Sequence, residues 1–359
     1  MSDDAASPAA AATTASISRS NWQRLRRWVS PLLGITGLLL LALAIYATLG
    51  SARGAREALA AAQNLRWWHV VIACLVPVCN FALTSLIFWL LTVRGAAAAQ
   101  TVTPSAPSLG SARAATISYG EMLALITSGT LLNQLPGKPG IIARTLYHKF
   151  ITKIPIRYTV LVMVQAVLFG GLGVLGSMLA GVIWLWASPL AGLFILCAML
   201  VSGGVAGAAL SRRGVQSAPL WICAVAVCGL RTVETLLWTL RYAVMLDVAG
   251  VRLGLGEALV VAGASQLAIL LPIQVGVREW TVGIVTAMLA KMGAASSVGE
   301  LGAAAESLTI DGMRPGVLAD LLCRGADLAV MVPAGAIASV WVYGRIRRAQ
   351  ARAALAQSL

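Results

Sequence analysis

The stretch YGEMLALITSGTLLNQLPGKPG at residues 119–140 has a second copy in LGEALVVAGASQLAILLPIQVG at residues 255–276. Each copy holds a Gly-Glu pair, a Pro after fourteen further residues, and a Gly four positions later: Gly120-Glu121, Pro136 and Gly140, then Gly256-Glu257, Pro272 and Gly276. Three leucines also coincide: Leu123, Leu131 and Leu135 with Leu259, Leu267 and Leu271. In a membrane chain, short apolar segments broken by Pro and Gly at corresponding places in two halves point to a substrate path. The repeat therefore predicts a transporter.

The composition is that of a membrane protein. Of the 359 residues, 59% are apolar and only 11% are charged, which leaves too little polar surface for a soluble domain of ordinary size. Runs long enough to cross a hydrocarbon layer of ~30 Å recur along the chain. They lie at 32–49, 69–93, 158–210 (two spans joined near Trp186 and Pro189), 220–240 and 318–343. We predict an all-α polytopic membrane protein with about six transmembrane helices.

The distribution of charge predicts the orientation. The net charge is +14, and the basic residues cluster beside apolar runs: Arg24, Arg26 and Arg27; Lys138, Arg144, Lys149, Lys153 and Arg157; Arg212 and Arg213; Arg345, Arg347, Arg348 and Arg352. Because cytoplasmic loops carry excess Lys and Arg, these clusters indicate cytoplasmic termini in a bacterial-type inner (plasma) membrane, not nucleic-acid binding. Arg241, Asp247 and Arg252 are then expected outside, after the span at 220–240.

The same reasoning gives the domain organisation. Residues 1–27 are rich in Ala, Ser and Thr and lack the features of a signal peptide, so we expect a disordered cytoplasmic tail. Residues 28–345 form one integral membrane domain with repeat elements at 119–144 and 255–280 and a flexible linker at 96–116. Residues 346–359 form a basic cytoplasmic tail.

Each repeat element is too short to cross the membrane. The segment from Glu121 to Leu135 reaches only ~22 Å as a helix, at ~1.5 Å per residue. Each element is therefore predicted to be a re-entrant hairpin that enters and leaves by one face. Three spans separate the two elements, an odd number, so the first opens from the cytoplasm and the second from outside. The sequence thus predicts an inverted-topology internal repeat.

Polar residues lie near the predicted hairpin tips. Broken backbone inside a bilayer is tolerated only where protein or a water-filled cavity covers it, so the tips are expected to meet in the protein interior. The polar residues there are Asn133, Gln134 and Lys138 in one copy, and Gln266, Gln274 and Arg278 in the other. They are candidates to line a polar path for an anionic head group. The alternative is that the amides only cap helix ends.

Other charged residues are candidates for coupling or gating. Glu121 and Glu257 begin their elements, where the helix dipole stabilises a carboxylate. Because the glutamate occurs in both copies, it is also a candidate gate or proton carrier. Two further sets are spaced for self-pairing along one helix: Arg231 with Glu234, and Arg324 with Asp320 and Asp327. Arg231, Glu234 and Arg324 remain second-rank path candidates.

Signals of enzymatic chemistry are weak. The only histidines, His69 and His148, are far apart, so they predict neither a metal cluster nor a histidine-based triad. Gly137-Lys138 lacks the pattern of a nucleotide-binding loop. The six cysteines fall in apolar spans, where they usually pack as small residues. We expect no metal, no cofactor and no enzymatic activity.

Two motifs resemble those of a known family. The run Asn133-Gln134-Leu135-Pro136-Gly137-Lys138-Pro139-Gly140 followed by Arg144, and the run Leu271-Pro272-Ile273-Gln274-Val275-Gly276-Val277-Arg278-Glu279, resemble the signatures of the lysylphosphatidylglycerol synthase transmembrane (flippase-like) family. The resemblance covers roughly residues 30 to 345. The chain departs from the family pattern at Ile273-Gln274, where paired glycines are usual, and at Lys138-Pro139.

The resemblance implies a membrane protein that handles polar lipids, here without the family's cytoplasmic aminoacyl-transferase domain. It also implies a set of site positions: Asn133, Pro136, Gly140 and Arg144, then Pro272, Gly276, Arg278 and Glu279.

The predicted function is a lipid flippase that moves a polar, anionic lipid of the phospholipid, glycolipid or hopanoid class between leaflets. Glu121, Glu257 or Glu279 would carry coupling protons. Partners would be the lipid itself and enzymes of lipid biosynthesis. Two alternatives stay open: a membrane-embedded transferase using Glu279 with Arg278, and a non-transporting accessory subunit of a lipid pathway.

Overall fold

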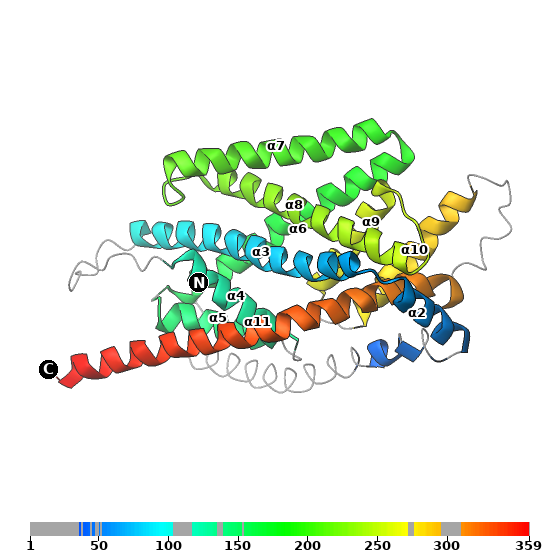
Figure 1. The fold of residues 1–359 in the computed structure, drawn as a ribbon. Helices are drawn as coiled ribbons and strands as arrows, with labels where there is room; N and C mark the ends of the chain where they lie inside the picture. The colour runs from blue at the N-terminus through cyan, green and yellow to red at the C-terminus, as the bar shows by residue number, and fades with distance from the viewer. Residues whose placement is uncertain are drawn as a thin grey trace, which may run out of the picture.

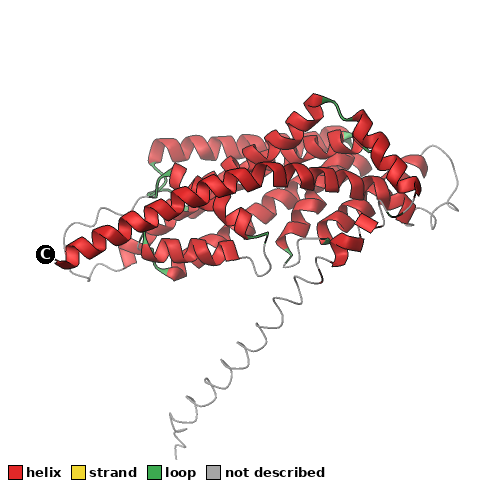
Figure 2. Cartoon of the chain, turned by 60° about the horizontal axis from the view of Figure 1, so that its bottom comes forward, coloured by secondary structure: helices red, strands yellow, loops and turns green. Residues whose placement is uncertain are grey.

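The computed structural model describes residues 36, 39–43, 45–46, 50, 52–102, 117–134, 139–152, 154–271, 276–295 and 310–358. Within these ranges the chain is helical, and no strand occurs (Figure 2). The helices are α2 (Ala52–Asn64), α3 (Trp67–Val102), α4 (Tyr119–Leu132), α5 (Pro139–Phe150), α6 (Ile156–Trp186), α7 (Pro189–Arg213), α8 (Leu220–Val248), α9 (Leu255–Leu270), α10 (Val277–Ala295) and α11 (Ile310–Ser358).

Five of the described helices are long and apolar enough to cross a membrane, which makes the chain a multi-pass membrane protein. They contain the spans Trp67–Ala97, Ile156–Trp186, Pro189–Arg213, Leu220–Val248 and Gly312–Ala351. Large apolar side chains cover their outer surfaces, Leu172, Phe194 and Ile337 among them, as expected where lipid replaces water. The predicted span at 32–49 lies largely outside the described residues.

The boundary between α6 and α7 follows from the sequence. α6 ends at Trp186 and α7 begins at Pro189, where the fixed backbone of Pro suits the first turn of a helix and its missing N–H costs nothing. The prediction of two spans joined here is confirmed. α7 then packs mainly on its neighbours α6 and α8. It approaches α8 closely where Gly203 meets Gly229.

Two pairs of short helices interrupt the long ones, at the places where the sequence repeats. α4 begins at Tyr119 after Ser118, whose side chain accepts a hydrogen bond from the Glu121 amide. α9 begins at Leu255, and Glu257 accepts one from the Gly254 amide at 2.7 Å. Each of these helices packs on the short helix that follows, α5 or α10. We call α4 with α5 the first pair and α9 with α10 the second pair.

The packing of one half repeats in the other. The packing of α3 on α4, of α4 on α5, of α5 on α6 and of α3 on α6 recurs as α8 on α9, α9 on α10, α10 on α11 and α8 on α11. The halves also exchange partners: α11 packs on α4 and α3, and α6 packs on α9 and α8. α3 and α8 pack on each other. α7 has no counterpart in this scheme.

The two pairs lie toward opposite ends of the bundle. Figure 1 shows α4 and α5 toward the end where the C-terminus lies, and α9 and α10 toward the other end. α3, α7 and α11 run in one direction along the bundle, and α6 and α8 run in the other. The last described residue after α4, Gln134, bonds to Arg324 and Met331 in the middle part of α11.

Several helices are longer than predicted. α3 continues to Val102, so the first part of the expected linker at 96–116 is helical, while residues 103–116 lie outside the described residues. α8 continues from the predicted end at residue 240 to Val248. α11 continues to Ser358 and takes in most of the predicted tail. The helix α2 was not predicted.

Candidate functional site

A polar cavity of about 240 Å³ lies inside the bundle, beside both chain breaks. The last turn of α4 supplies Thr130, Asn133 and Gln134, and the second pair supplies Ile269 and Arg278. The long helices complete its wall with Pro77, Asn80 and Phe81 from α3, Trp238 from α8, and Arg324, Asp327, Leu328 and Met331 from α11. The structure thus brings together four of the predicted path residues: Asn133, Gln134, Arg278 and Arg324.

Arg324 is held in place by an uncharged partner. Its Nη2 donates to the Oε1 atom of Gln134 at 3.1 Å, and the Nε2 atom of Gln134 donates to the Sδ atom of Met331 at 3.4 Å. Among the ion pairs formed by described residues, none involves Arg324. Arg324 therefore lines the cavity as a cation without a bonded carboxylate.

Arg278 is buried and firmly paired. Its Nε donates to the Oδ2 atom of Asp320 at 3.0 Å, and both side chains are almost fully buried. Tyr242 donates to the other oxygen of Asp320 and also shares a hydrogen bond with Ser265. Because breaking one partner of a buried ion pair typically costs ~3–5 kcal/mol, Asp320 fixes the start of α10 to α11.

Asp327 links a second buried arginine to the same network. Its Oδ1 atom accepts from Arg241 at 2.6 Å, and its Oδ2 atom lies 3.5 Å from Nη1 of Arg278. The prediction that Asp320 and Asp327 pair with Arg324 along one helix is wrong, because arginines of neighbouring helices reach both carboxylates. The expectation that Arg241 lies outside is also wrong: α8 continues past it, and its side chain is fully buried.

Glu279 is a buried carboxylate beside this network. Its Oε2 atom accepts from the Gly276 amide at 2.8 Å, and its side chain is fully buried. Gly276 has a φ of 86°, a left-handed backbone that glycine adopts without the cost a side chain would bring. This turn fixes where α10 begins.

Several buried polar atoms on the cavity wall have no hydrogen-bond partner among the described residues. They are Asn133 Oδ1, Trp238 Nε1 and Arg278 Nη2. An unpaired buried polar atom costs roughly 1–3 kcal/mol, so native structures keep few of them. All three belong to side chains that line the same cavity.

An apolar groove of about 750 Å³ lies between α4, α5 and the C-terminal part of α11. Its wall includes Leu132, Leu146 and Phe150 from the first pair, and Val342 and Ile346 from α11. α4 and α11 border both the groove and the polar cavity. The two spaces therefore share a wall.

Glu121 ties the outer end of α4 to its neighbours. It is buried, accepts a short hydrogen bond from Tyr147 of α5, and accepts another from Arg345 of α11 at 3.1 Å. Glu121 lies in the first turn of α4, at the opposite end of the helix from the last turn, which lines the cavity. Glu257 lies at the outer end of α9, where it caps the helix through Gly254.

Arg231 and Glu234 form the predicted ion pair on α8. Arg231 packs where Gly170 and Gly173 of α6 leave room for it. Neither side chain lines the polar cavity.

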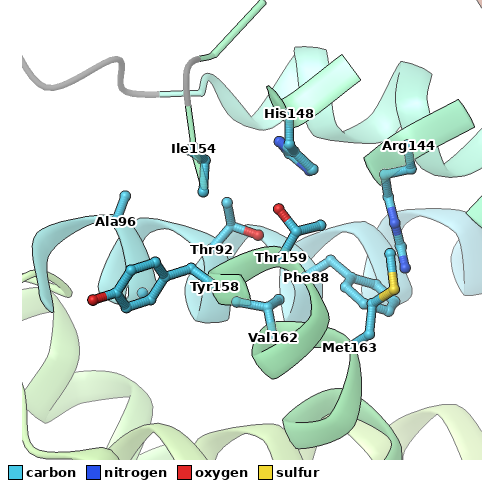
Figure 3. A pocket seen from close by; sticks show the side chains of 11 residues that line it. Phe88, Thr92, Ala96, Arg144, His148, Ile154, Tyr158, Thr159, Val162 and Met163 are labelled. Atoms are coloured by element: carbon cyan, nitrogen blue, oxygen red, sulfur yellow. The ribbon is translucent and has the colours of Figure 1, made fainter. Parts of the chain in front are cut away.

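Gly140 and Arg144 belong to the first pair but not to the cavity wall. A Cβ atom on Gly140 would lie 2.0 Å from the carbonyl oxygen of Gly129, so this glycine lets α5 approach α4. Figure 3 shows Arg144 reaching toward Phe88 of α3, with its Cζ atom 4.0 Å from the ring centroid. Arg144 lines both the apolar groove and a small pocket between α3, α5 and α6.

Four candidate residues, Pro136, Lys138, Pro272 and Gln274, lie outside the described residues. In turn, sequence reasoning missed several residues of the site: Asn80, Trp238, Arg241, Tyr242 and Ser265. An arginine inside an apolar span could have identified Arg241, because intramembrane charges are functional by default. The other four give no signal in the sequence.

No group of three or more metal-ligating side chains occurs in the described part of the chain. No family model, curated protein or solved structure matches the chain. The resemblance to the lysylphosphatidylglycerol synthase transmembrane family therefore stays a prediction based on its two motifs.

Proposed function

We propose that this protein moves a polar lipid between the leaflets of a bacterial-type inner membrane. The observation that carries the proposal is the position of the polar cavity. Both chain breaks border a space that holds two arginines, an aspartate and several amides inside a membrane bundle. Polar cavities at broken helices are where membrane transporters bind their substrates.

The arrangement of the two pairs supports an inverted repeat. They lie toward opposite ends of the bundle, and the four helices of one half pack as the four of the other do. With three spans between them, the first pair would enter from the cytoplasm and the second from outside, as re-entrant hairpins. Such a repeat gives the central cavity access to either side in turn.

The neighbouring groove supports a lipid as the substrate. An apolar wall of this kind suits acyl or isoprenoid chains, each buried CH₂ contributing ~0.8 kcal/mol. The polar cavity across α4 would take the head group. A lipid could then keep its tails in apolar surroundings while its head crosses the bundle, and Arg144 would lie at the groove where the lipid enters.

The test is leaflet exchange of a fluorescent anionic phospholipid in vesicles containing the purified protein, with Thr130→Trp as the key variant. The indole would fill much of the cavity, so we expect exchange to fall at least tenfold. Ser202→Trp, on the exposed surface of α7, is the matched control and should exchange as the wild type does.

The lipids are extracted and analysed afterwards. Wild-type vesicles without exchange would overturn the proposal and favour an accessory subunit. A chemically altered lipid would favour a transferase instead.

A further inference from the structure

We propose that the polar cavity is a binding site for a single phosphate group, with Arg324 as its principal ligand. The inference deepens the proposed function, on which it rests for the source of the phosphate: the head group of a phospholipid. The same chemistry would also accept free inorganic phosphate, and the experiment below separates the two sources.

The hydrogen-bond donors that remain available around the cavity point to an anion. Trp238 Nε1 and Arg278 Nη2 are buried donors without partners among the described residues, and both residues line the cavity. Arg324 adds a guanidinium whose recorded bond is to an amide. Trp238, Arg278 and Arg324 thus bring side chains with N–H donors to one cavity wall, and such donors suit the oxygens of an ionised phosphate, which accept hydrogen bonds.

Two carboxylates near the cavity are already bound to other arginines, and a third, Glu279, accepts from the Gly276 amide and does not line the cavity. Asp327 lines the cavity, but its two oxygens face Arg241 and Arg278. Asp320 lies behind Arg278 and is bound by it and by Tyr242. These pairs offset the charge of Arg278 and Arg241, which leaves Arg324 as the lining cation to balance an incoming phosphate.

The planar guanidinium of Arg324 suits the several oxygens of a phosphate group. Gln134 fixes one side of the guanidinium, so the planar fork is already oriented toward the cavity and loses less rotamer freedom on binding. Asn133 also lines the cavity, but its Oδ1 atom lies against Gly140 of α5.

The cavity also limits what can bind. At about 240 Å³ it lies below the ~300–1,000 Å³ of ordinary small-molecule pockets. It therefore accommodates a phosphate with a short polar substituent, while two acyl chains have to remain outside in the groove or the bilayer.

The experiment is calorimetric titration of the detergent-purified full chain with three probes: inorganic phosphate, a short-chain phosphatidylglycerol, and a short-chain diacylglycerol as the phosphate-free control. We expect the phospholipid to bind and the diacylglycerol to bind at least tenfold more weakly. Arg324→Gln should weaken phospholipid binding by about 10- to 100-fold, the size of one charge-assisted hydrogen bond. Arg324→Lys should lose less, because it keeps the charge.

Arg252→Gln is the matched control, since it removes the charge of an exposed arginine, and it should bind as the wild type does. Thermal unfolding of each variant shows whether it remains folded. Binding of inorganic phosphate with the same dependence on Arg324 would identify free phosphate as a ligand too. Equal binding by Arg324→Gln, or equal affinity for the diacylglycerol, would overturn the site.

Failure of the site and failure of the proposed function are distinguishable. Phosphate binding that depends on Arg324, in a protein that exchanges no lipid, leaves the site standing and removes the flippase. Wild-type exchange together with equal phospholipid binding by Arg324→Gln removes the site and leaves the flippase.

Discussion

The first and second pairs share a sequence pattern but are held in place by different interactions. α9 is deeply buried, with Leu259 and Val261 fully enclosed, and α10 begins at a turn fixed by the paired Arg278 and the capped Glu279. α5 instead exposes large apolar side chains such as Ile142 and Phe150, and glycines bring it against α4. One repeat therefore serves as a fixed, charged wall, and the other as a peripheral element at an apolar groove.

The largest effect is expected from breaking the charged wall of the second pair. Asp320→Asn would leave Arg278 buried without its main counter-ion, and we expect a loss of ~3–5 kcal/mol in the free energy of unfolding. The measurement is unfolding in detergent, followed by intrinsic fluorescence. At the position of the first pair that corresponds to Arg278, Ile142→Ala should change stability by less than ~1 kcal/mol.

A double variant makes this prediction sharper. Replacing Arg278 by Met and Asp320 by Leu together removes both buried charges, so most of the lost stability should return. If the double variant is as unstable as Asp320→Asn, the ion pair is not what fixes α10.

The next effect concerns the glycines that end each copy of the pattern. Gly140→Ala places a methyl group against the Gly129 carbonyl, and we expect ~1–3 kcal/mol of destabilisation from overpacking. Gly276→Ala meets a different obstacle, its left-handed backbone, at about 1–2 kcal/mol. Thermal unfolding measures both.

Gly120→Ala is the matched control, because nothing lies within 4 Å of an added Cβ atom and Ala favours a helix. It should be neutral or stabilising. A loss of stability in Gly120→Ala would mean that steric contact at the added Cβ atom does not determine the loss at these glycines.

The smallest effects are expected at the two glutamates. Glu121→Gln weakens the links to Tyr147 and Arg345; Arg345 is partly exposed, which screens its charge, so we expect ~1 kcal/mol. Glu257→Gln weakens only a cap, worth a few tenths of a kcal/mol. Hydrogen exchange of the amides in the first turns of α4 and α9 compares the two. Equal protection in both variants would contradict the idea that Glu121 joins three helices.

The sequence predicted those features of the fold that depend on local pattern. Apolar length located the long helices, Pro189 marked the start of α7, and the repeat located both chain breaks. The ion pairs between different helices could not be predicted from the sequence. Spacing along α11 suggested that Asp320 and Asp327 pair with Arg324, but their partners come from α10 and α8, some forty and eighty residues earlier in the sequence.

The candidate site was predictable to a similar extent. Polar residues next to a predicted break, such as Asn133 and Gln134, were found because the unpaired backbone groups of a broken helix need polar partners. Trp238 and Asn80 lie in unbroken helices and reach the cavity only through packing. No feature of their local sequence separates them from residues that face lipid.

The helix without a counterpart, α7, has a place in the proposed inverted repeat. In the proposed topology the first half begins and ends outside, and the second begins and ends in the cytoplasm. Fusing two ancestral copies that inserted in opposite directions therefore requires one additional crossing. α7, packed mainly along α6 and α8, has the position of that connector. As a connector, it would tolerate replacement by another apolar helix of equal length, provided that the glycine at position 203 is kept for the contact with Gly229.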